Sequence, residues 1–252
     1  MPELAEARQS DYDFEIADEV KEKIEQAKDL HELIPEDRVR DLEKVDLSHR
    51  PYRYVKRGLD FLISLGALLV CVIPMLIIAL VVFIDEPGLP VFAQYRVGRF
   101  GKRFKLYKFR TMKRETPKYM STMEMAEPDR YVTKVGRLLR KLSLDELPQL
   151  INVLKGNMSL VGPRPLISDE YEIHAMRTRF GVYDIRPGVT GLAQINGRDQ
   201  VGPEEKVRWD VEYMRHYGPK QDLKILFHTV PKVFKGADVK EGGKAGEEER
   251  AG

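Results

Sequence analysis

The chain has 252 residues, of which 33% are charged and 42% are hydrophobic. This length suits one substantial domain with an appendage, and the composition excludes both wholesale disorder and a protein with many membrane spans. The single cysteine, Cys71, excludes a disulfide framework and a cysteine-cluster metal site. Residues 1–20 are acidic, so we expect no cleavable signal peptide and a cytoplasmic location for the folded part.

The charge is unevenly distributed along the chain. Residues 1–48 contain 16 acidic and 7 basic residues, whereas the whole chain carries a formal net charge of +2. The remainder is therefore strongly basic. Such an asymmetry predicts an acidic appendage on a domain that meets anions, which leaves a polyanion, a phosphorylated substrate and an anionic lipid as alternatives.

The acidic appendage contains a narrow apolar stripe at helical spacing, formed by Val20, Ile24, Ala27, Leu30 and Ile34. One interpretation is a solvated helix that lies on the domain. The other is a helix that docks a partner or forms a homodimer. The stripe itself does not choose between them.

The most apolar segment comes next. The 24 residues from Phe61 to Ile84 contain no charged residue. As one helix they would reach ~36 Å, enough to cross a hydrocarbon core, and a soluble protein rarely buries so long a helix without a polar face. We therefore expect this segment to enter the membrane. Pro74, near its middle, removes one backbone hydrogen bond and favours a kink.

Basic residues flank this segment on both sides. Four lie between positions 50 and 57, and ten Lys or Arg residues lie between 91 and 118. Basic flanks prefer the cytoplasmic side, so a helix that turns back at Pro74 satisfies both flanks. Six aromatic residues accompany the second run, which also suits nucleic acid. Its place beside a membrane segment favours lipid headgroups and a phosphorylated substrate instead, and no nucleic-acid partner is expected.

Two later segments have an amphipathic pattern. In residues 131–142 five apolar side chains share one helical face: Val132, Val135, Leu138, Leu139 and Leu142. Basic residues occupy the other positions, which suits a helix in a membrane interface. Residues 222–234 form a second candidate, although Pro231 argues against a straight helix there. From Gly236 onward Gly, Lys and Glu dominate, and we predict a disordered tail.

The segment SLDELPQL at 143–150 holds two adjacent carboxylates, Asp145 and Glu146. One interpretation is a helix start, with Ser143 as N-cap and Glu146 closing a capping box. The alternative is catalytic, because the carboxylates follow a basic amphipathic helix and Arg140 is placed to neutralise a phosphate between them. A carboxylate attacks phosphorus only if it is ionised and cations offset the incoming charge.

Two segments rich in Gly and Pro follow, SLVGPRPL at 159–166 and RPGVTGLAQINGR at 186–198. Tight turns of this kind expose backbone amides that bind phosphate oxygens, although a plain loop region has the same composition. Arg164 lies between two prolines, so a rigid backbone holds its guanidinium in place. The histidines show no metal-ligand spacing. Any metal should be a hard cation held by carboxylates and substrate phosphates, and Mg²⁺ is the natural candidate.

Read in order, these motifs resemble the bacterial sugar transferases, also called monotopic phosphoglycosyl transferases. The matching elements are KRGLDF at 56–61, an apolar segment with a central proline, QYRVGRFGKRFKLYKFRTM at 94–112, SLDELPQLINVLKGNMSLVGPRPL at 143–166, and RPGVTGLAQINGR at 186–198. The resemblance covers roughly residues 51–235. The chain departs from the family at Ile73, where a serine often precedes the proline, and at Asn157, where an aspartate is common.

The resemblance implies a reaction. Members transfer a sugar-1-phosphate from a nucleotide sugar, usually a UDP-sugar, to a polyprenol phosphate such as undecaprenyl phosphate, and release UMP. The family's dyad maps onto Asp145 and Glu146. Asp145 would form a phosphosugar–enzyme intermediate, and Glu146 would assist through the metal or as a base. Mg²⁺ would bridge the diphosphate and Asp145, with Glu146 as the second metal-binding residue. We expect four cations to bind the substrate phosphates: Lys108, Arg110, Arg140 and Arg164.

The expected fold class is α/β and mostly helical, with a re-entrant membrane helix, amphipathic interfacial helices and a small cytoplasmic catalytic domain. The expected parts are an acidic appendage at 1–50, the membrane helix at 51–90, the catalytic domain at 91–235 and the tail at 236–252. The expected location is the bacterial inner membrane, in contact with membrane lipid. Two alternatives are a membrane-associated glycosyltransferase that releases UDP and a membrane-anchored anion-binding protein without catalytic activity.

Overall fold

The computed structural model describes residues 39–116, 128–168, 170–197 and 202–234. The predicted stripe at 20–34 and the predicted tail from Gly236 lie outside them. The elements are α4 (Tyr52–Asp85), β1 (Val91–Val97), η1 (Arg99–Gly101), β2 (Arg103–Phe109), α5 (Pro128–Tyr131), α6 (Lys134–Lys141), η2 (Leu144–Glu146), α7 (Gln149–Leu154), β3 (Ser159–Val161), α8 (Tyr171–Arg179), η3 (Val182–Asp184), β4 (Gly188–Thr190), α9 (Leu192–Asn196), α10 (Pro203–Arg215) and α11 (Pro219–Phe234).

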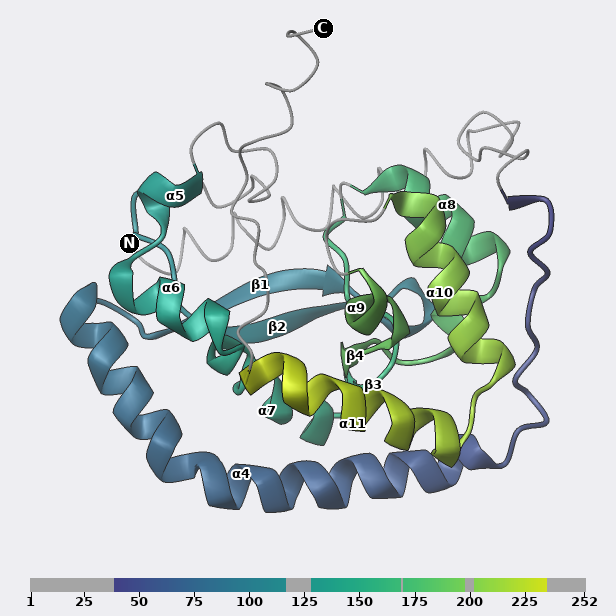
Figure 1. Ribbon diagram of the computed structural model, residues 1–252, viewed down its shortest axis with the longest axis horizontal. Helices are drawn as coiled ribbons and strands as arrows, with labels where there is room; N and C mark the ends of the chain where they lie inside the picture. Colours follow the sequence, from purple (N-terminus) through teal and green to yellow (C-terminus); the bar gives the residue numbers. More distant parts are fainter. Residues whose placement is uncertain (1–38, 117–127, 169, 198–201, 235–252) are drawn as a thin grey trace, which may run out of the picture.

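Two small sheets lie among the helices (Figure 1). Strands β1 and β2 form an antiparallel hairpin in which Val91 faces Phe109 and Val97 faces Arg103. Its tip turns at Gly101, whose φ of +70° suits glycine. Strands β3 and β4 pair in parallel, with Val161 opposite Thr190. The described chain is therefore a mostly helical α/β protein, as the sequence predicts.

Helix α4 confirms the prediction of a long apolar helix. In Figure 1 it runs along the lower edge of the molecule and bends upward toward its C-terminal end. Pro74 lies inside it and lacks the N–H that the Val70 carbonyl would otherwise bind, which is the usual cause of such a bend. Its side chains are widely exposed, 77% for Val70 and 69% for Ile84. An exposed apolar surface of this extent requires a lipid or protein cover.

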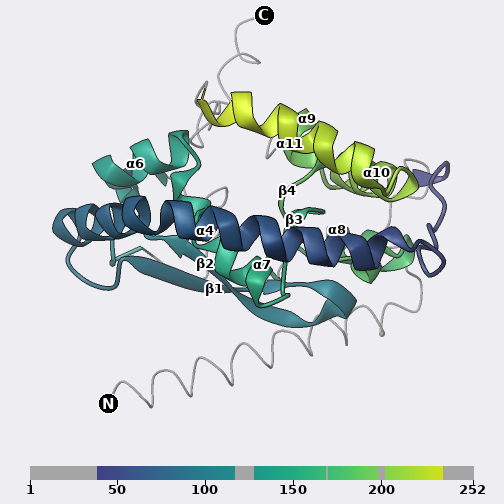
Figure 2. The same ribbon diagram turned by 90° about the horizontal axis from the view of Figure 1, so that it is seen from below.

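Both ends of α4 contact the rest of the described chain, from β1 to α11, which we call the body (Figure 2). Near the N-terminal end Lys56, Asp60 and Ser64 are buried. Near the C-terminal end Val82 is buried in a cluster with Phe109 and Leu139, which belong to β2 and α6. The middle of the helix is left largely uncovered. The two ends of the apolar segment therefore lie on one body instead of being separated from each other.

A buried polar network attaches the base of α4 to α10 and α11. The Lys56 Nζ atom lies 2.5 Å from Asp222 Oδ2. The hydroxyls of Tyr52 and Tyr213 each donate to the Asp222 carboxylate at 2.8 Å. Asp222 is 6% exposed and Lys56 5%. Because these groups satisfy one another, the charges are buried without an unpaired partner.

A second carboxylate attaches α4 to β3. Asp60 accepts hydrogen bonds from the Ser159 hydroxyl at 2.7 Å and from the Leu160 backbone N–H at 3.2 Å. The Oδ1 atom that accepts from Leu160 also lies 3.6 Å from the Lys56 Nζ atom, one helical turn away. Lys56 and Asp60 belong to the KRGLDF motif, so this motif serves to fix the direction in which α4 leaves the body.

The main hydrophobic core lies between α8, α10, α11 and β3. It includes Val39 and Leu47, which are 1% and 5% exposed. These residues fall in the segment that the sequence assigns to the acidic appendage. Residues 39–47 thus pack with the body, and Asp41 adds an exposed ion pair with Arg208 at 2.5 Å.

The amphipathic segment predicted at 131–142 is shorter than expected. Helix α6 begins at Lys134, because Val132 forms an isolated β-bridge with Met112. Leu139 is buried against α4 and β2, whereas Leu138 is 57% exposed. Part of the predicted apolar face thus packs against protein, and part of it remains exposed.

Helix α11 agrees better with the expected interfacial pattern. Leu223 is 54% exposed and Phe227 72% exposed, whereas Ile225 is completely buried in the main core. Pro231 lies inside the helix without ending it. One side of α11 thus anchors it to the body and another presents apolar side chains outward.

The attachment of α4 predicts a large effect of Asp222→Asn. The variant removes the charge that balances buried Lys56, so we expect a loss of about 3 kcal/mol in the free energy of unfolding. Denaturation in detergent, followed by circular dichroism, measures it. Asp85→Asn, at the exposed end of α4, is the matched control and should change stability little. Equal stability of the two variants would contradict a structural role for the network.

Candidate active site

The two predicted carboxylates lie on η2, directly after α6. Ser143, which precedes η2, has a left-handed backbone with φ +54° and makes no side-chain cap hydrogen bond. The capping-box interpretation is therefore wrong. A non-glycine residue in this conformation is uncommon, and such residues cluster at functional sites. The left-handed turn redirects the chain, so that Asp145 is buried while Glu146 remains partly exposed.

The start of α6 is held tightly against the end of β2. A Cβ atom on Gly136 would lie 2.1 Å from the carbonyl oxygen of Thr111, so only glycine fits this approach. The Thr133 backbone N–H donates to the same carbonyl at 3.1 Å. The Arg140 Nε atom donates to the Thr111 hydroxyl at 2.9 Å. These contacts fix the distance between α6, the dyad that follows it, and β2.

Helix α7 continues from the dyad and is fixed to β2 by a buried asparagine. The Asn152 side chain accepts from the Tyr107 backbone N–H at 3.0 Å and donates to the Lys105 carbonyl at 2.6 Å. At the other end Arg57 donates to the carbonyls of Val153 and Leu154 at 2.7 and 3.0 Å, which satisfies the helix C-terminus. The dyad is therefore held between two helices that are both bound to β2.

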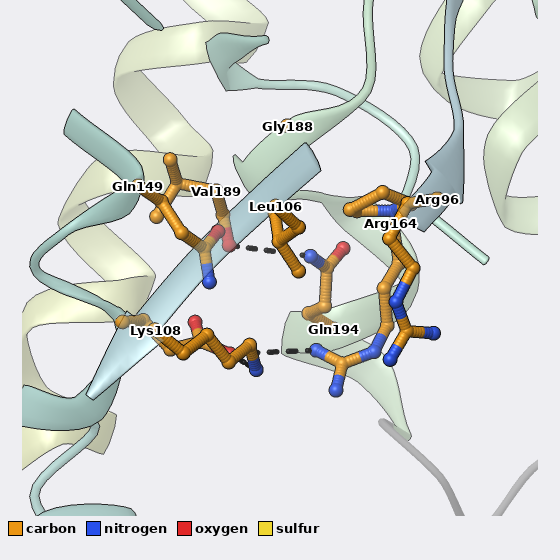
Figure 3. Close-up of a pocket in the computed structure, with 10 residues that line it drawn as sticks. Arg96, Leu106, Lys108, Gln149, Arg164, Gly188, Val189 and Gln194 are labelled. Carbon is orange, nitrogen blue, oxygen red and sulfur yellow. Dashed lines mark hydrogen bonds and ion pairs between the residues drawn. The ribbon is translucent and has the colours of Figure 1, made fainter. Parts of the chain in front are cut away.

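Two predicted cations, Lys108 and Arg164, meet at Glu146 of the dyad. The Lys108 Nζ atom lies 2.8 Å from Glu146 Oε1. The Arg164 Nη1 atom lies 3.9 Å from the same oxygen. Figure 3 shows Lys108 and Arg164 pointing toward each other from opposite sides of the pocket. One carboxylate oxygen thus brings together a strand of the hairpin and the loop after β3.

Asp145 is the more buried member of the dyad, at 8% exposed. Burial raises the pKa of its carboxyl above the usual range, and the Glu146 carboxylate raises it further. The cations of Lys108 and Arg140 act in the opposite direction. A desolvated carboxylate with cations beside it has the character of a nucleophile, because the cations favour its ionised form.

A pocket opens beside the dyad (Figure 3). Its lining residues are Arg96, Leu106, Lys108, Glu146, Gln149, Arg164, Pro165, Gly188, Val189 and Gln194. Arg96, Gln149 and Gln194 were not singled out in the sequence. Arg96 is one of ten similar cations in the basic run, and the two glutamines lie within motifs whose individual polar residues carry no separate signal. The pocket is rich in cations, which suits a ligand with several phosphate oxygens.

Close backbone packing shapes the floor of this pocket. A Cβ atom on Gly188 would lie 2.1 Å from the Gly162 nitrogen, and one on Gly191 would lie 2.1 Å from the Gly162 carbonyl oxygen. No side chain fits at these positions. The glycines at these positions are thus needed for contact between backbones, and the N–H groups of Gly162 and Gly188 donate to the carbonyls of Thr190 and Pro163.

Arg110 lies apart from the other predicted cations. It is close to Arg114 and Glu86, at the turn between α4 and β1. Burial lowers its pKa, and the neighbouring Arg114 cation lowers it further. The structure therefore brings Lys108, Arg140 and Arg164 to the dyad but places Arg110 toward the C-terminal end of α4.

The dyad offers a small donor set for a metal ion. Among the described residues, no group of three or more His, Cys, Asp or Glu side chains is arranged to hold one. Asp145 and Glu146 supply two carboxylates, and Mg²⁺ is commonly bound by one or two carboxylates together with substrate phosphates and water. The residues present fit Mg²⁺ that arrives with a phosphorylated substrate.

Comparison with known proteins shows which family the chain resembles over most of its length. A family model described as bacterial sugar transferase matches residues 51–236. The chain is 45% identical over 168 residues to the uncharacterized sugar transferase EpsL of Bacillus subtilis. This match covers 66% of this chain and 81% of that protein. It is 40% identical over 193 residues to the exopolysaccharide production protein ExoY of Rhizobium meliloti, covering 71% and 84%.

A third relative has a more specific name. The chain is 41% identical over 190 residues to the UDP-glucose:undecaprenyl-phosphate glucose-1-phosphate transferase of Escherichia coli. The match covers 72% of this chain but 40% of that longer protein. The chain thus spans less than half the length of this relative.

The site geometry predicts that Lys108 lowers the pKa of Asp145. Lys108→Met removes a cation that stabilises the ionised carboxylate, so the pKa of Asp145 should rise further above its usual range. Carbon NMR titration of protein labelled with ¹³C-aspartate measures the change. Lys105→Met is the matched control, because Lys105 lies on the opposite face of β2 and is exposed. An unchanged pKa in the Lys108 variant would contradict the assigned electrostatic role.

Proposed function

Because the chain belongs to the bacterial sugar transferase family, we propose that it transfers a sugar-1-phosphate from a UDP-sugar to a polyprenol phosphate and releases UMP. The name of the Escherichia coli relative supports undecaprenyl phosphate as acceptor, and that of ExoY supports a role in exopolysaccharide synthesis. The observation that carries the proposal is the buried Asp145 carboxylate, with Glu146, Lys108 and Arg164 beside it at the mouth of a cationic pocket.

The proposed chemistry has two displacements at one phosphorus atom. An Asp145 oxygen attacks the sugar-bearing phosphorus, the bond to the bridging oxygen breaks, and UMP leaves. The product is an acyl phosphate that joins the sugar phosphate to Asp145. An oxygen of the polyprenol phosphate then attacks the same phosphorus, and the bond to Asp145 breaks. This releases a polyprenol diphosphate sugar and restores the carboxylate.

The residues around Asp145 have distinct roles in this proposal. Lys108 and Arg140 favour its ionised form, which is the nucleophilic one. Arg164 extends from a proline-flanked loop and meets the phosphates of the nucleotide sugar. Glu146, which forms an ion pair with Lys108, assists through the metal or as a base. Arg110, toward the membrane helix, is the cation best placed to meet the acceptor phosphate.

Mg²⁺ is part of the proposal, because Asp145 and Glu146 would hold it together with the diphosphate. When bound, it neutralises charge on the diphosphate and on the departing phosphate. The chain's own residues bind the substrate, keep Asp145 desolvated and limit the access of water, which would otherwise hydrolyse the intermediate.

We also propose that α4 is re-entrant and that the body lies at the cytoplasmic face of the inner membrane. Three observations support this arrangement: the exposed apolar middle of α4, its bend, and the packing of both its ends on one body. The backbone groups left without partners at Pro74 need nearby protein or water, since lipid supplies none. The apolar side chains of Leu223 and Phe227 on α11 extend the surface that contacts lipid.

The covalent step predicts the behaviour of Asp145→Asn. The amide keeps the shape of the side chain but cannot form an acyl phosphate, so turnover should fall by at least about a thousandfold in a folded protein. Incubation with a UDP-sugar and Mg²⁺, without acceptor, should add one sugar phosphate to the wild-type mass and none to the variant. Omitting Mg²⁺ should prevent the adduct.

Glu43→Gln, an exposed substitution far from the site, is the control for this experiment and should behave as wild type. The nucleotide released identifies the reaction. UMP supports the phosphosugar transfer, whereas UDP would show a glycosyltransferase that moves the sugar without its phosphate. A fully active Asp145→Asn protein would exclude the covalent mechanism.

The re-entrant arrangement predicts that both ends of α4 face the cytoplasm. In a Cys71→Ala background, single cysteines replace Ser48 and Glu115, which are exposed on either side of α4. In intact cells both should resist a thiol reagent that does not cross membranes, and both should react after lysis. Labelling of one position in intact cells would mean that α4 spans the bilayer. Pro74→Ala should increase that spanning population.

A further inference from the structure

The loop that carries Arg164 cannot be held by hydrogen bonds of its own. Pro163 and Pro165 have no backbone N–H, so the loop has few donors and many carbonyl acceptors. Its carbonyls are instead bound from outside. The Pro163 carbonyl accepts from the Gly188 N–H at 2.8 Å, and the Leu166 carbonyl accepts from the Val97 N–H at 3.0 Å. The remaining two contacts come from buried side chains.

The first of these side chains is Arg177 on α8. Its Nη1 atom donates to the Arg164 carbonyl oxygen at 2.8 Å. Its Nε and Nη2 atoms lie 2.9 and 2.7 Å from Asp210 Oδ2 on α10. Both side chains are 2% exposed. The guanidinium is thus fixed by Asp210 on one edge and fixes the backbone of the pocket residue with another.

The second side chain is His174, one turn earlier on α8. Its Nε2 atom lies 2.7 Å from the Ile167 carbonyl oxygen, and its Nδ1 atom contacts the Tyr183 hydroxyl. A carbonyl only accepts, so Nε2 carries the proton and Nδ1 accepts from Tyr183. Burial lowers the pKa of His174 to about 4, which agrees with a neutral ring. Two side chains of α8 therefore hold the loop on both sides of Pro165.

We infer that Arg177, fixed by Asp210 and assisted by His174, is a positioning residue that holds Arg164 at the nucleotide-sugar site. This inference rests on the proposed function. The ion pair lies behind the loop and does not line the pocket, so it acts on the substrate only through Arg164. Stability alone does not require a charged pair here, because apolar side chains of similar volume often serve equally well. What they lack is a directed donor for the Arg164 carbonyl.

A double-mutant cycle tests the inference with a readout that a merely structural role would not move. The pair variant Arg177→Met with Asp210→Leu removes the ion pair without leaving a buried charge unpaired. Arg164→Ala removes the proposed ligand contact. The affinity for UDP is measured by calorimetry in detergent for the wild type, the two variants and their combination, together with kcat and KM for the UDP-sugar.

Each change alone should weaken UDP binding about tenfold, the usual size of a lost charge-assisted contact. The combined protein should show the same tenfold loss, because the pair has nothing left to position once the Arg164 side chain is absent. KM should rise more than kcat falls. Additive losses of about a hundredfold, or unchanged binding in the pair variant, would overturn the inference.

Thermal unfolding is recorded for every variant. If the pair variant does not fold, Arg177→Lys replaces it in the same cycle, since a lysine lacks the planar fork that contacts Asp210 and the Arg164 carbonyl from separate nitrogen atoms. Failure of both variants to fold would make the network purely structural and overturn the assignment. UDP binding and UMP release by the wild type distinguish failure of this inference from failure of the proposed function. An active wild type with an additive cycle would contradict the inference alone. A wild type that does not bind UDP would contradict the proposed function as well.

Discussion

The buried ion pair between Lys56 and Asp222 is the contact on which the arrangement of the molecule depends. It joins a helix that is suited to lipid to a body that is strongly charged, and these two parts prefer different solvents. Only a satisfied network allows charged groups to lie at the base of an apolar helix. Since Asp60 binds β3 from the same helix, the direction of α4 is fixed relative to the strand that precedes the Arg164 loop.

The geometry of the candidate site depends on the three elements that supply its cations. The hairpin supplies Lys108, α6 supplies Arg140, and the loop after β3 supplies Arg164. Hydrogen bonds attach α6 to Thr111 after β2 and the Arg164 loop to α8, so these elements are not held by hydrophobic packing alone. A site that handles phosphates benefits from this, because cations at fixed positions stabilise developing charge without reorganisation during the reaction.

The sequence predicted the apolar helix, the adjacent carboxylates and Arg164, because each has a local signature. It failed where the outcome depends on distant partners. The capping pattern around Ser143 is local, but the left-handed turn that the structure has there leaves no local signature in the sequence. The amphipathic pattern placed Leu139 on an apolar helical face but did not indicate that Val82 of α4 would pack against it. Arg177 and Asp210 lie on different helices, so no spacing rule connects them.

The attachment of α4 also bears on the order of events during synthesis. Lys56 and Asp222 are 166 residues apart in the chain, so α4 is complete long before its partner is made. In that interval the charges at the base of α4 have no buried partner and remain hydrated. The contact that attaches the body to α4 therefore forms only after the first turn of α11 has been translated.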